Sequence, residues 1–344
     1  MIPVTLIGIP ETKRAIYFQK AAAQAGVPCL LWDWAQRPFR FPTGCFVKID
    51  PPLWASCNLD EMNVCIRRYQ KDLAALARLS EENDFQFLNH PNAIWDLLDK
   101  RRCKMRLLQA DLPITEPLTA FEEAPLLDAE QLMAKMAARR IFQVFIKPVC
   151  GSGAAGVTAF RFQPGKSKMA LYTCAVLETS SGQLVNTKRL RRFSQARQVF
   201  PLLNHILKLD CIVERWYAKT EYHGLSYDLR AVMQDGHLDF LLARLSKGPI
   251  TNLHLNNQSL SATALNLSPP VLDSILELCQ KAMDCFPGLR SAGIDLLLEK
   301  KSQKPRIIEM NGQGDLIHQD IYQKNSIYRH QIALSQQPKE EMKK

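Results

Sequence analysis

A short apolar strand ends in a lysine, and a loop of small residues follows this lysine. Lys147 comes after the apolar residues 144–146, and the loop at 151–156 reads Gly-Ser-Gly-Ala-Ala-Gly. Glycine lets backbone N–H groups approach a ligand and lysine supplies a point charge, so this stretch can hold a phosphate chain. The lysine precedes the glycines, unlike in a P-loop or a dinucleotide fingerprint. A glycine hairpin after an edge strand is the alternative interpretation.

Two acidic residues interrupt strands that are otherwise apolar. Asp295 lies within residues 292–298, and Glu309 lies within 306–310, two residues before Asn311. A buried carboxylate is costly unless it is paired or binds a metal. A hairpin would place the two acids opposite each other, and their oxygens with the Asn amide oxygen suit Mg²⁺ or Mn²⁺ shared with phosphates. A structural salt bridge is the alternative for each acid alone, whereas the set favours a metal.

The elements that must position these residues are predicted by hydrophobic periodicity. Apolar runs at 4–8 and 27–32 flank a helical pattern at 13–25, which is typical of an α/β domain with parallel strands. A long helical pattern at 58–79 carries an apolar stripe that core packing explains. The later patterns are helices at 93–99, 100–110, 129–140 and 271–285, and strands at 158–162, 169–177, 211–217, 227–233 and 238–245.

The composition favours a globular protein with an anionic ligand. The chain has 344 residues, 47% of them hydrophobic, and a formal net charge of +10. This length suits two or three domains. The positive charge favours a nucleotide, an acidic peptide or nucleic acid, but no nucleic-acid module is recognisable, so nucleic acid is not expected. The basic segment at 188–192 is either a solvated surface run or a grip for an acidic substrate or for the nucleotide.

The ten cysteines form no CxxC pair and mostly lie among apolar neighbours. They are therefore expected to be reduced thiols, and none is given a catalytic role. No apolar run approaches the roughly 20 residues that cross a bilayer. A cytoplasmic location without membrane contact is the resulting expectation.

Taken in order, these motifs resemble the ATP-grasp superfamily of the carboxylate-amine ligase type, in a branch of bacterial appearance. The resemblance covers residues 89–316. Its motifs are Lys100 or Lys104 on an early helix, Lys147-Pro148 before the small-residue loop, Glu214-x-Trp216-Tyr217, Asp228-x-Arg230, Arg244, Thr251-Asn252, Asp295 and Glu309-x-Asn311.

The resemblance implies an ATP-grasp fold in which an α/β domain precedes two α+β subdomains that clamp ATP. The expected units are an N-terminal parallel α/β domain at 1–85, a central subdomain at 86–210, a C-terminal subdomain at 211–335 and a disordered tail at 336–344.

The resemblance also implies roles for individual residues. The expected nucleotide-binding residues are Lys100 or Lys104, Lys147, Gly151, Ser152, Gly153, Gly156, the backbone of Glu214, Trp216 and Tyr217, and Glu221 at the ribose. Asp295, Glu309 and Asn311 would hold the metal. Arg230, Arg244 and Asn252 would face the transferred phosphoryl group or the acceptor.

The implied reaction joins a carboxylate to an amine through an acylphosphate, with ATP and Mg²⁺ (or Mn²⁺) as cofactors. The expected substrate is an amino acid, a peptide or another small molecule with a carboxylate, together with an amine acceptor. A kinase-like phosphotransferase and a non-catalytic nucleotide-binding protein are the alternatives. Whether the protein forms a homo-oligomer is left open by the sequence.

The chain departs from the family pattern after Asn311. Many relatives continue with a small residue, proline and glycine, whereas Gly312-Gln313-Gly314-Asp315 stands here. Asp315 and His318 are then either substrate-side groups or parts of a loop with different turn chemistry, and the loop is favoured. The segment 178–207 also matches no family motif. Both departures bear on the substrate more than on the nucleotide.

Overall fold

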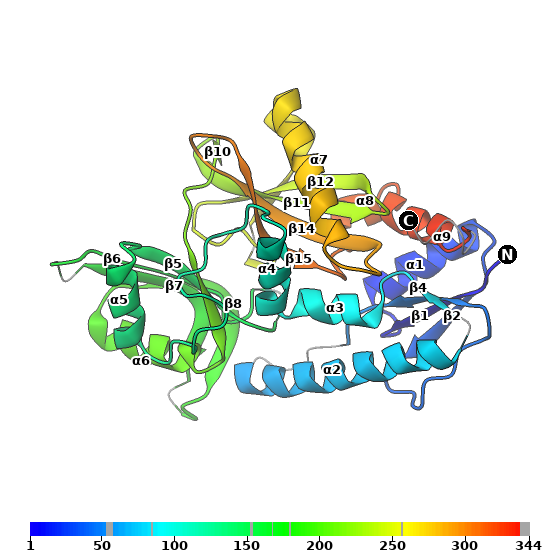
Figure 1. Cartoon of the computed structure of the whole chain (residues 1–344), viewed down its shortest axis with the longest axis horizontal. Coiled ribbons are helices and arrows are strands. Elements are labelled where there is room, and N and C mark those ends of the chain that lie inside the picture. The colour runs from blue at the N-terminus through cyan, green and yellow to red at the C-terminus, as the bar shows by residue number, and fades with distance from the viewer. Residues whose placement is uncertain are drawn as a thin grey trace.

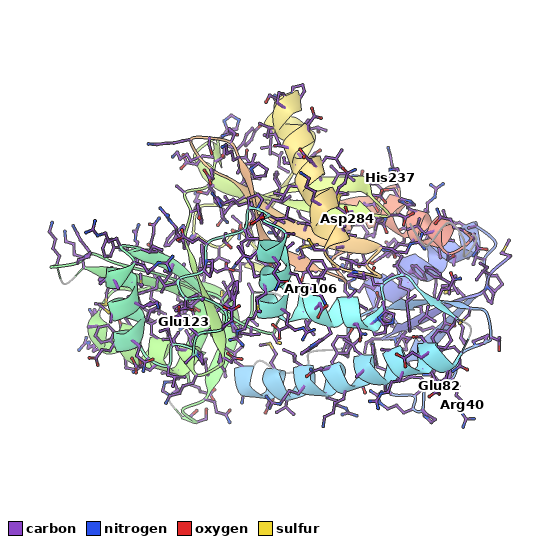
Figure 2. All side chains as sticks on the ribbon, viewed as in Figure 1. Arg40, Glu82, Arg106, Glu123, His237 and Asp284 are labelled. Atoms are coloured by element: carbon purple, nitrogen blue, oxygen red, sulfur yellow. The ribbon has the colours of Figure 1, made fainter. Side chains whose placement is uncertain are left out.

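The computed structural model describes residues 1–52, 58–83, 85–151, 154–166, 168–178, 180–255 and 257–337. Ser152 and Gly153 of the expected phosphate loop lie outside these residues, and so do residues 338–344 of the expected tail. Charged side chains such as Arg40, Glu82 and Asp284 are exposed (Figure 2). Within the described ranges no helix is both long and apolar enough to cross a membrane.

The chain begins with a parallel sheet of strand order β2-β1-β3-β4. All five residues of β1 are buried, as an inner strand of a parallel sheet requires. The side chain of Thr12 accepts a hydrogen bond from the Ala15 N–H and so caps the helix between β1 and β2. The elements are β1 (Val4–Gly8), α1 (Lys13–Gln24), β2 (Cys29–Asp33), β3 (Phe46–Ile49), α2 (Leu59–Glu82) and β4 (Gln86–Phe87).

Helix α2 is shared between two hydrophobic cores. Its first turns place Leu59, Met62 and Ile66 in the core of the central sheet, whereas Tyr69 and Leu73 pack under the N-terminal sheet. Figure 1 shows α2 running from beneath the N-terminal sheet toward β8. The apolar stripe predicted from the sequence therefore contacts two domains rather than one.

The central sheet is antiparallel, with strand order β8-β7-β6-β5-β9. Helices α5 and α6 contribute Leu132 and Leu203 to a core with Ile146 and Phe160 of the sheet, and so cover one of its faces. The expected boundary at residue 211 falls before β9, which pairs with β5 in this sheet. The elements are α5 (Ala129–Ala138), β5 (Gln143–Pro148), β6 (Thr158–Phe162), β7 (Met169–Leu177), β8 (Leu184–Phe193), α6 (Ala196–Leu207) and β9 (Cys211–Arg215).

The C-terminal sheet has the order β13-β12-β11-β14-β15, and β10 pairs with β11. Its core takes side chains from α7 and also from α3 and α4, such as Leu97 and Leu107. Helices α3 and α4, which precede the central sheet in sequence, thus pack against this sheet. The elements are α3 (Pro91–Leu98), α4 (Lys100–Gln109), β10 (Glu221–Tyr222), β11 (Leu225–Gln234), β12 (His237–Ser246), β13 (Gln258–Ser261), α7 (Pro269–Asp284), β14 (Ser291–Leu298) and β15 (Pro305–Asn311), with short 3₁₀ turns at Leu253–Leu255 and Ala262–Leu265.

The last helices return to the N-terminal domain. Helix α8 (His318–Ile321) leads into α9 (Ser326–Leu334), which lies beside α1 (Figure 1). Ile327, Tyr328 and Ile332 share a core with residues of β1 and α1. The core of the first domain is therefore completed by residues more than 300 positions later in the chain.

Candidate nucleotide and metal site

A cavity of about 570 Å³ lies between the central and C-terminal sheets, and we call it the interdomain cavity. Its volume is within the range of roughly 300–1,000 Å³ that is usual for ligand pockets. Its walls include Lys147 at the end of β5, residues of β11, β12, β14 and β15, and Arg14 from the N-terminal domain. Many of the residues singled out from the sequence line it: Lys100, Lys147, Gly151, Glu214, Tyr217, Arg230, Arg244, Asn252, Asp295, Glu309 and Asn311.

Two lysines converge on one buried glutamate at the central side of the cavity. Lys147 Nζ donates to Glu214 Oε2 at 2.6 Å, and Lys104 Nζ lies 2.8 Å from Glu214 Oε1. Thr115 Oγ1 also donates to Glu214 Oε2, at 2.9 Å. Burial disfavours the charged carboxylate, but the two ammonium groups outweigh burial and lower the pKa of Glu214 to about 2. Glu214 therefore holds the lysines in place as a carboxylate.

The structure separates the two lysines that the sequence left as alternatives. Lys104 is 2% exposed and lies behind Glu214, outside the cavity lining. Lys100 lines the cavity, where its Nζ donates to the Gly151 carbonyl at 3.0 Å and lies 3.4 Å from Glu309 Oε1. Of the three lysines singled out from the sequence, Lys100 and Lys147 are thus the ones that a ligand could reach.

The small-residue loop folds back on the strand that carries Lys147. Gly156 has φ +69°, and a Cβ there would lie 2.8 Å from Pro148 Cγ, so glycine is needed at this position. A Cβ on Gly151 would meet Met62 of α2 at 3.4 Å. Within the described part of the loop, Gly151, Ala154 and Ala155 line the cavity, and Gly156 supports the turn behind them.

The two acids and the asparagine lie together on the opposite wall. Strands β14 and β15 pair so that Asp295 is opposite Glu309 and Gly293 is opposite Asn311. Asp295 accepts from the Nε of Arg230, and its Oδ2 lies 3.0 Å from Nη2 of Arg244. The hairpin predicted from the sequence therefore forms, and both arginines are directed at one of its acids.

The donor set on this wall suits a metal that is shared with a ligand. Among the described residues no three His, Cys, Asp or Glu side chains are grouped closely enough to bind a metal on their own. Two carboxylates and an amide oxygen are a typical protein contribution to Mg²⁺, which takes its other ligands from phosphates and water. Asp295, Glu309 and Asn311 fit such an ion.

The structure adds Lys219 to Asp228, Arg244 and Thr251 of the motifs named above, in one buried polar cluster. Lys219 Nζ lies 3.3 Å from Asp228 Oδ2 and 2.9 Å from Thr251 Oγ1. Asp228 also accepts from Arg244 Nε at 2.7 Å. Burial lowers the pKa of Lys219 although Asp228 opposes this, whereas for Asp228 the two cations outweigh burial and lower its pKa. In the sequence, the Asp-x-Arg pattern formed by Asp228 and Arg230 was the signal from which a site role for Asp228 could have been predicted.

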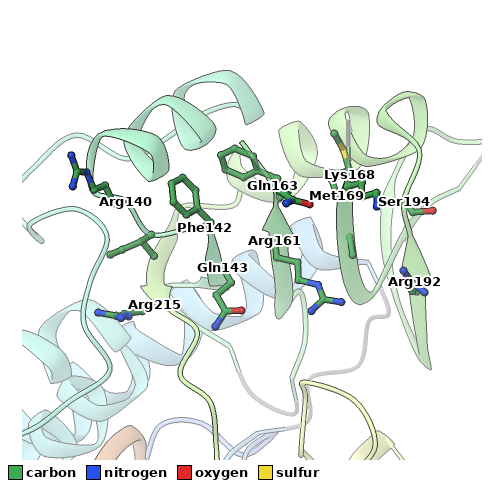
Figure 3. A pocket seen from close by; sticks show the side chains of 13 residues that line it. Arg140, Phe142, Gln143, Arg161, Gln163, Lys168, Met169, Arg192, Ser194 and Arg215 are labelled. Atoms are coloured by element: carbon green, nitrogen blue, oxygen red, sulfur yellow. The ribbon is translucent and has the colours of Figure 1, made fainter. Parts of the chain in front are cut away.

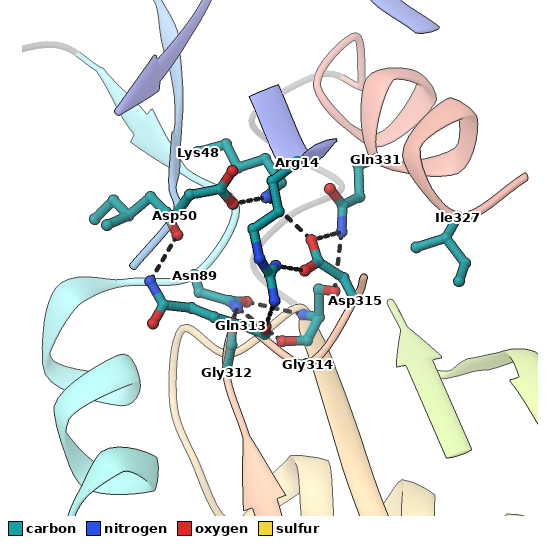
Figure 4. Close-up of polar contacts among 12 residues, drawn as sticks. Arg14, Lys48, Asp50, Asn89, Gly312, Gln313, Gly314, Asp315, Ile327 and Gln331 are labelled. Atoms are coloured by element: carbon teal, nitrogen blue, oxygen red, sulfur yellow. Dashed lines mark hydrogen bonds and ion pairs between the residues drawn. The ribbon is translucent and has the colours of Figure 1, made fainter. Parts of the chain in front are cut away.

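The loop after the hairpin is held by the N-terminal domain (Figure 4). Asp315 is 3% exposed and is ion-paired with Arg14 and with Lys48, whose Nζ is also paired with Asp50. Gln313 donates to the Tyr69 hydroxyl at 2.7 Å and to the Ile49 carbonyl at 2.9 Å. The position of this loop, which begins at Asn311, thus depends on side chains from the first 70 residues.

Some of the singled-out residues take other positions. Glu221, expected at the ribose, is exposed on β10, is ion-paired with Lys300 at 2.7 Å and does not line the cavity. The Trp216 ring is also outside the lining and packs against Phe145 at 5.5 Å. The sequence left open whether Asp315 and His318 contact the substrate. Asp315 is buried in the interdomain ion pairs, whereas His318 is exposed and lines the cavity.

No family model matches the chain, and no match was found among curated proteins. Solved structures are similar over almost the full length. D-cycloserine synthetase DcsG has a TM-score of 0.59 and 14% identity, covering 99% of both chains. Macrocyclase MdnC from Microcystis aeruginosa, bound with the precursor peptide MdnA, has a TM-score of 0.61 and 11% identity, covering 97% of this chain and 99% of MdnC.

A third similar structure is a RiPP-associated ATP-grasp ligase from Chryseobacterium gregarium in complex with ADP and a leader and core peptide. Its TM-score is 0.61 at 12% identity, covering 97% of this chain and 96% of the ligase. These identities are low, and the coverage is nearly complete on both sides. The chain has the ATP-grasp fold.

Proposed function

We propose that the protein is an ATP-dependent carboxylate-amine ligase that acts on an amino-acid or peptide substrate. One observation carries this proposal: Lys147 of the central sheet, Lys100 of α4 and carboxylates of the C-terminal sheet line the same cavity. Lys100 and Lys147 are suited to phosphate oxygens, and Asp295, Glu309 and Asn311 are suited to magnesium. The similarity to ATP-grasp ligases supports the same reaction class.

The ion pairs in the cavity are suited to exchange with the charges of a magnesium nucleotide. Lys100 is paired with Glu309, and Arg230 is paired with Asp295. Removing one partner from a buried ion pair is costly because the other charge stays uncompensated. A ligand that carries phosphates and a cation supplies a partner for each side. The pairs can therefore open without leaving an isolated charge.

In the proposed reaction, a substrate carboxylate oxygen attacks the γ-phosphorus of ATP, and the bond to the ADP oxygen breaks. An amine then attacks the acyl carbon of the acylphosphate, phosphate leaves and the amine loses a proton. Arg230 and Arg244 would stabilise charge on the transferred phosphoryl group. Magnesium, when bound, would neutralise phosphate charge. Asp228 and Asp295 hold the Arg244 guanidinium from two sides and so fix its direction.

The substrate would contact lining residues that the nucleotide and the metal do not use. His318, Gln319, Leu253 and Arg14 are among the residues that line the cavity. Two of the similar structures contain precursor, leader or core peptides. We therefore place amino acids and short carboxylate-bearing peptides first among the candidate substrates.

The test is ADP release from ATP and Mg²⁺ across a panel of amino acids and short peptides, with Glu309→Gln as the control. We expect release to require both a carboxylate and an amine. Stimulation by a hydroxyl compound without an amine would instead indicate a phosphotransferase. Tight ATP binding without stimulated release by any member of the panel would count against a ligase and favour a non-catalytic nucleotide-binding protein.

A further inference from the structure

A second cavity lies at the far end of the central sheet, and we call it the end cavity (Figure 3). Its volume is about 740 Å³. It is lined where β5 and β7 begin and where β6 and β8 end, by residues that include Gln143, Arg161, Met169 and Arg192. The glycine loop joins the opposite ends of β5 and β6. The end cavity is therefore separate from the place where phosphates would be held.

Positive side chains dominate the lining of the end cavity. Arg140, Arg161, Lys168, Arg192 and Arg215 line it, and no acidic residue does. Arg215 is ion-paired with Glu116 at 3.2 Å. In the part of the chain that the structure describes, the other four have no carboxylate partner. These four charges can therefore bind an anion without breaking an ion pair among the described residues.

Two of these arginines are oriented by aromatic rings. Arg161 lies over the ring of Trp216 at 5.9 Å, and Arg192 lies over the ring of Tyr172 at 5.9 Å. Stacking on a ring holds the planar guanidinium and leaves its edge free for a bidentate contact with a carboxylate. Arg192 belongs to the basic segment at 188–192, whose role the nucleotide site leaves unexplained.

Strand register fixes the separation of the two arginines. Arg161 is opposite Ala170, and Arg192 is opposite Tyr172, so both lie on the same face of the sheet with β7 between them. Two strand spacings and a two-residue offset place their Cα atoms about 12 Å apart. An extended peptide covers about 13 Å in four residues, and side chains four positions apart point to the same side.

We propose that the end cavity binds an acidic peptide segment in which carboxylates four residues apart contact Arg161 and Arg192. Single-stranded nucleic acid would stack its bases on exposed aromatic rings. The rings of Trp216 and Tyr172 are already covered by the two guanidinium groups, which disfavours nucleic acid. If the proposed ligase function holds, this peptide would be a part of its substrate outside the reacting group.

The experiment is fluorescence anisotropy of a labelled peptide with two glutamates four residues apart, added to the full chain without nucleotide. Replacing both glutamates with glutamine gives the matched peptide control. We expect the Arg161→Gln, Arg192→Gln double variant to bind the acidic peptide at least about tenfold more weakly. The Arg161→Lys, Arg192→Lys variant keeps both positive charges but loses the planar guanidinium groups that can contact both oxygens of a carboxylate. We expect its peptide affinity to lie between those of the wild type and the glutamine double variant.

The matched protein control removes two exposed arginines of α2, with Arg67→Gln and Arg68→Gln. We expect its peptide affinity to change less than twofold. The proposal is overturned if the control variant loses as much affinity, if a single-stranded oligonucleotide of equal charge binds as tightly, or if the acidic peptide does not bind. Since no nucleotide is present, these outcomes are independent of whether ATP is turned over.

Discussion

The two cavities of this protein differ in how their positive charges are compensated. Every lysine and arginine that lines the interdomain cavity is ion-paired: Arg14 with Asp315, Lys100 with Glu309, Lys147 with Glu214, Lys219 and Arg244 with Asp228, Arg230 with Asp295, and Arg215 with Glu116. In the end cavity, among described residues, Arg215 alone has such a partner.

This difference indicates different ligands. A cavity with paired charges can accept a ligand that carries both signs, because both members of each opened pair find a new partner. A cavity with unpaired cations favours a ligand of one sign only. This difference supports the proposals of a magnesium nucleotide for the interdomain cavity and an acidic segment for the end cavity, and four changes test the first of them.

The largest effect is expected from Glu214→Gln. This change leaves Lys104 and Lys147 buried without their carboxylate and makes the interdomain cavity resemble the end cavity. Breaking a buried ion pair on one side costs about 3–5 kcal/mol, so we expect the free energy of unfolding to fall by that amount. Urea denaturation followed by circular dichroism measures it. A loss below about 1 kcal/mol would show that the paired charges do not matter to the fold.

Glu309→Gln is expected to act on turnover rather than on the fold. Loss of a residue that hydrogen-bonds to a metal ligand typically lowers metal affinity or activity about 10–100-fold. Loss of a direct ligand, as proposed for Glu309, should therefore lower ADP release at least about 100-fold. Nucleotide binding should be retained. Glu221→Gln, on the exposed strand β10, is the matched control and should release ADP at the wild-type rate. Equal effects of the two changes would contradict the metal assignment.

Lys147→Ala should weaken ATP binding by about tenfold, because one charge-assisted hydrogen bond to phosphate is lost while Glu214 keeps Lys104 as a partner. Isothermal titration with ATP measures the change. Lys135→Ala removes a partly exposed lysine that is paired with Glu123, outside the cavity lining, and should leave ATP affinity unchanged. If ATP affinity survived the first change, the lysine would serve only to compensate Glu214.

The smallest effect is expected from Glu116→Gln, which removes the partner that Arg139 and Arg215 share at the surface. We expect a stability loss of about 0–1 kcal/mol, since exposed ion pairs contribute little. Urea denaturation measures it.

The contribution of Glu214 to stability is expected to depend on pH, and acid titration of the folded protein measures this dependence. The pKa of Glu214 falls from 4.5 to about 2, so its stabilisation is full above pH 4.5 and is lost as the pH drops toward 2. The Glu214→Gln variant should lack this dependence.

The parts of the site that are local in sequence could be predicted. Asp295 and Glu309 lie on adjacent strands joined by a short turn, so their pairing follows from the hairpin. Lys147 and its glycine loop are contiguous. Lys100 and Lys104 could not be distinguished, because residues four apart lie on the same face of a helix and only tertiary packing shows which one reaches the cavity.

The parts that depend on distant contacts could not be predicted. Asp315 meets Arg14 across 301 positions of sequence, and no periodic pattern encodes that contact. Glu221 follows the strand at Glu214 at a sequence distance that suits a ribose-binding residue. It lies on the short strand β10, however, and is ion-paired with Lys300. Many elements were readable from apolar periodicity, but β8 and α6 lie in the segment 178–207, to which the sequence assigned no helix or strand. The sheets against which β9 and α4 pack are determined by tertiary contacts.

The return of α9 to the first domain has a consequence for synthesis on the ribosome. The N-terminal sheet emerges before α9, but its core includes Ile327, Tyr328 and Ile332. Until α9 emerges, the apolar faces of α1 and β1 lack these partners, and such exposed surface attracts chaperones and other nascent chains. The N-terminal sheet is therefore made before the helix that completes its core, and it reaches its final packing late.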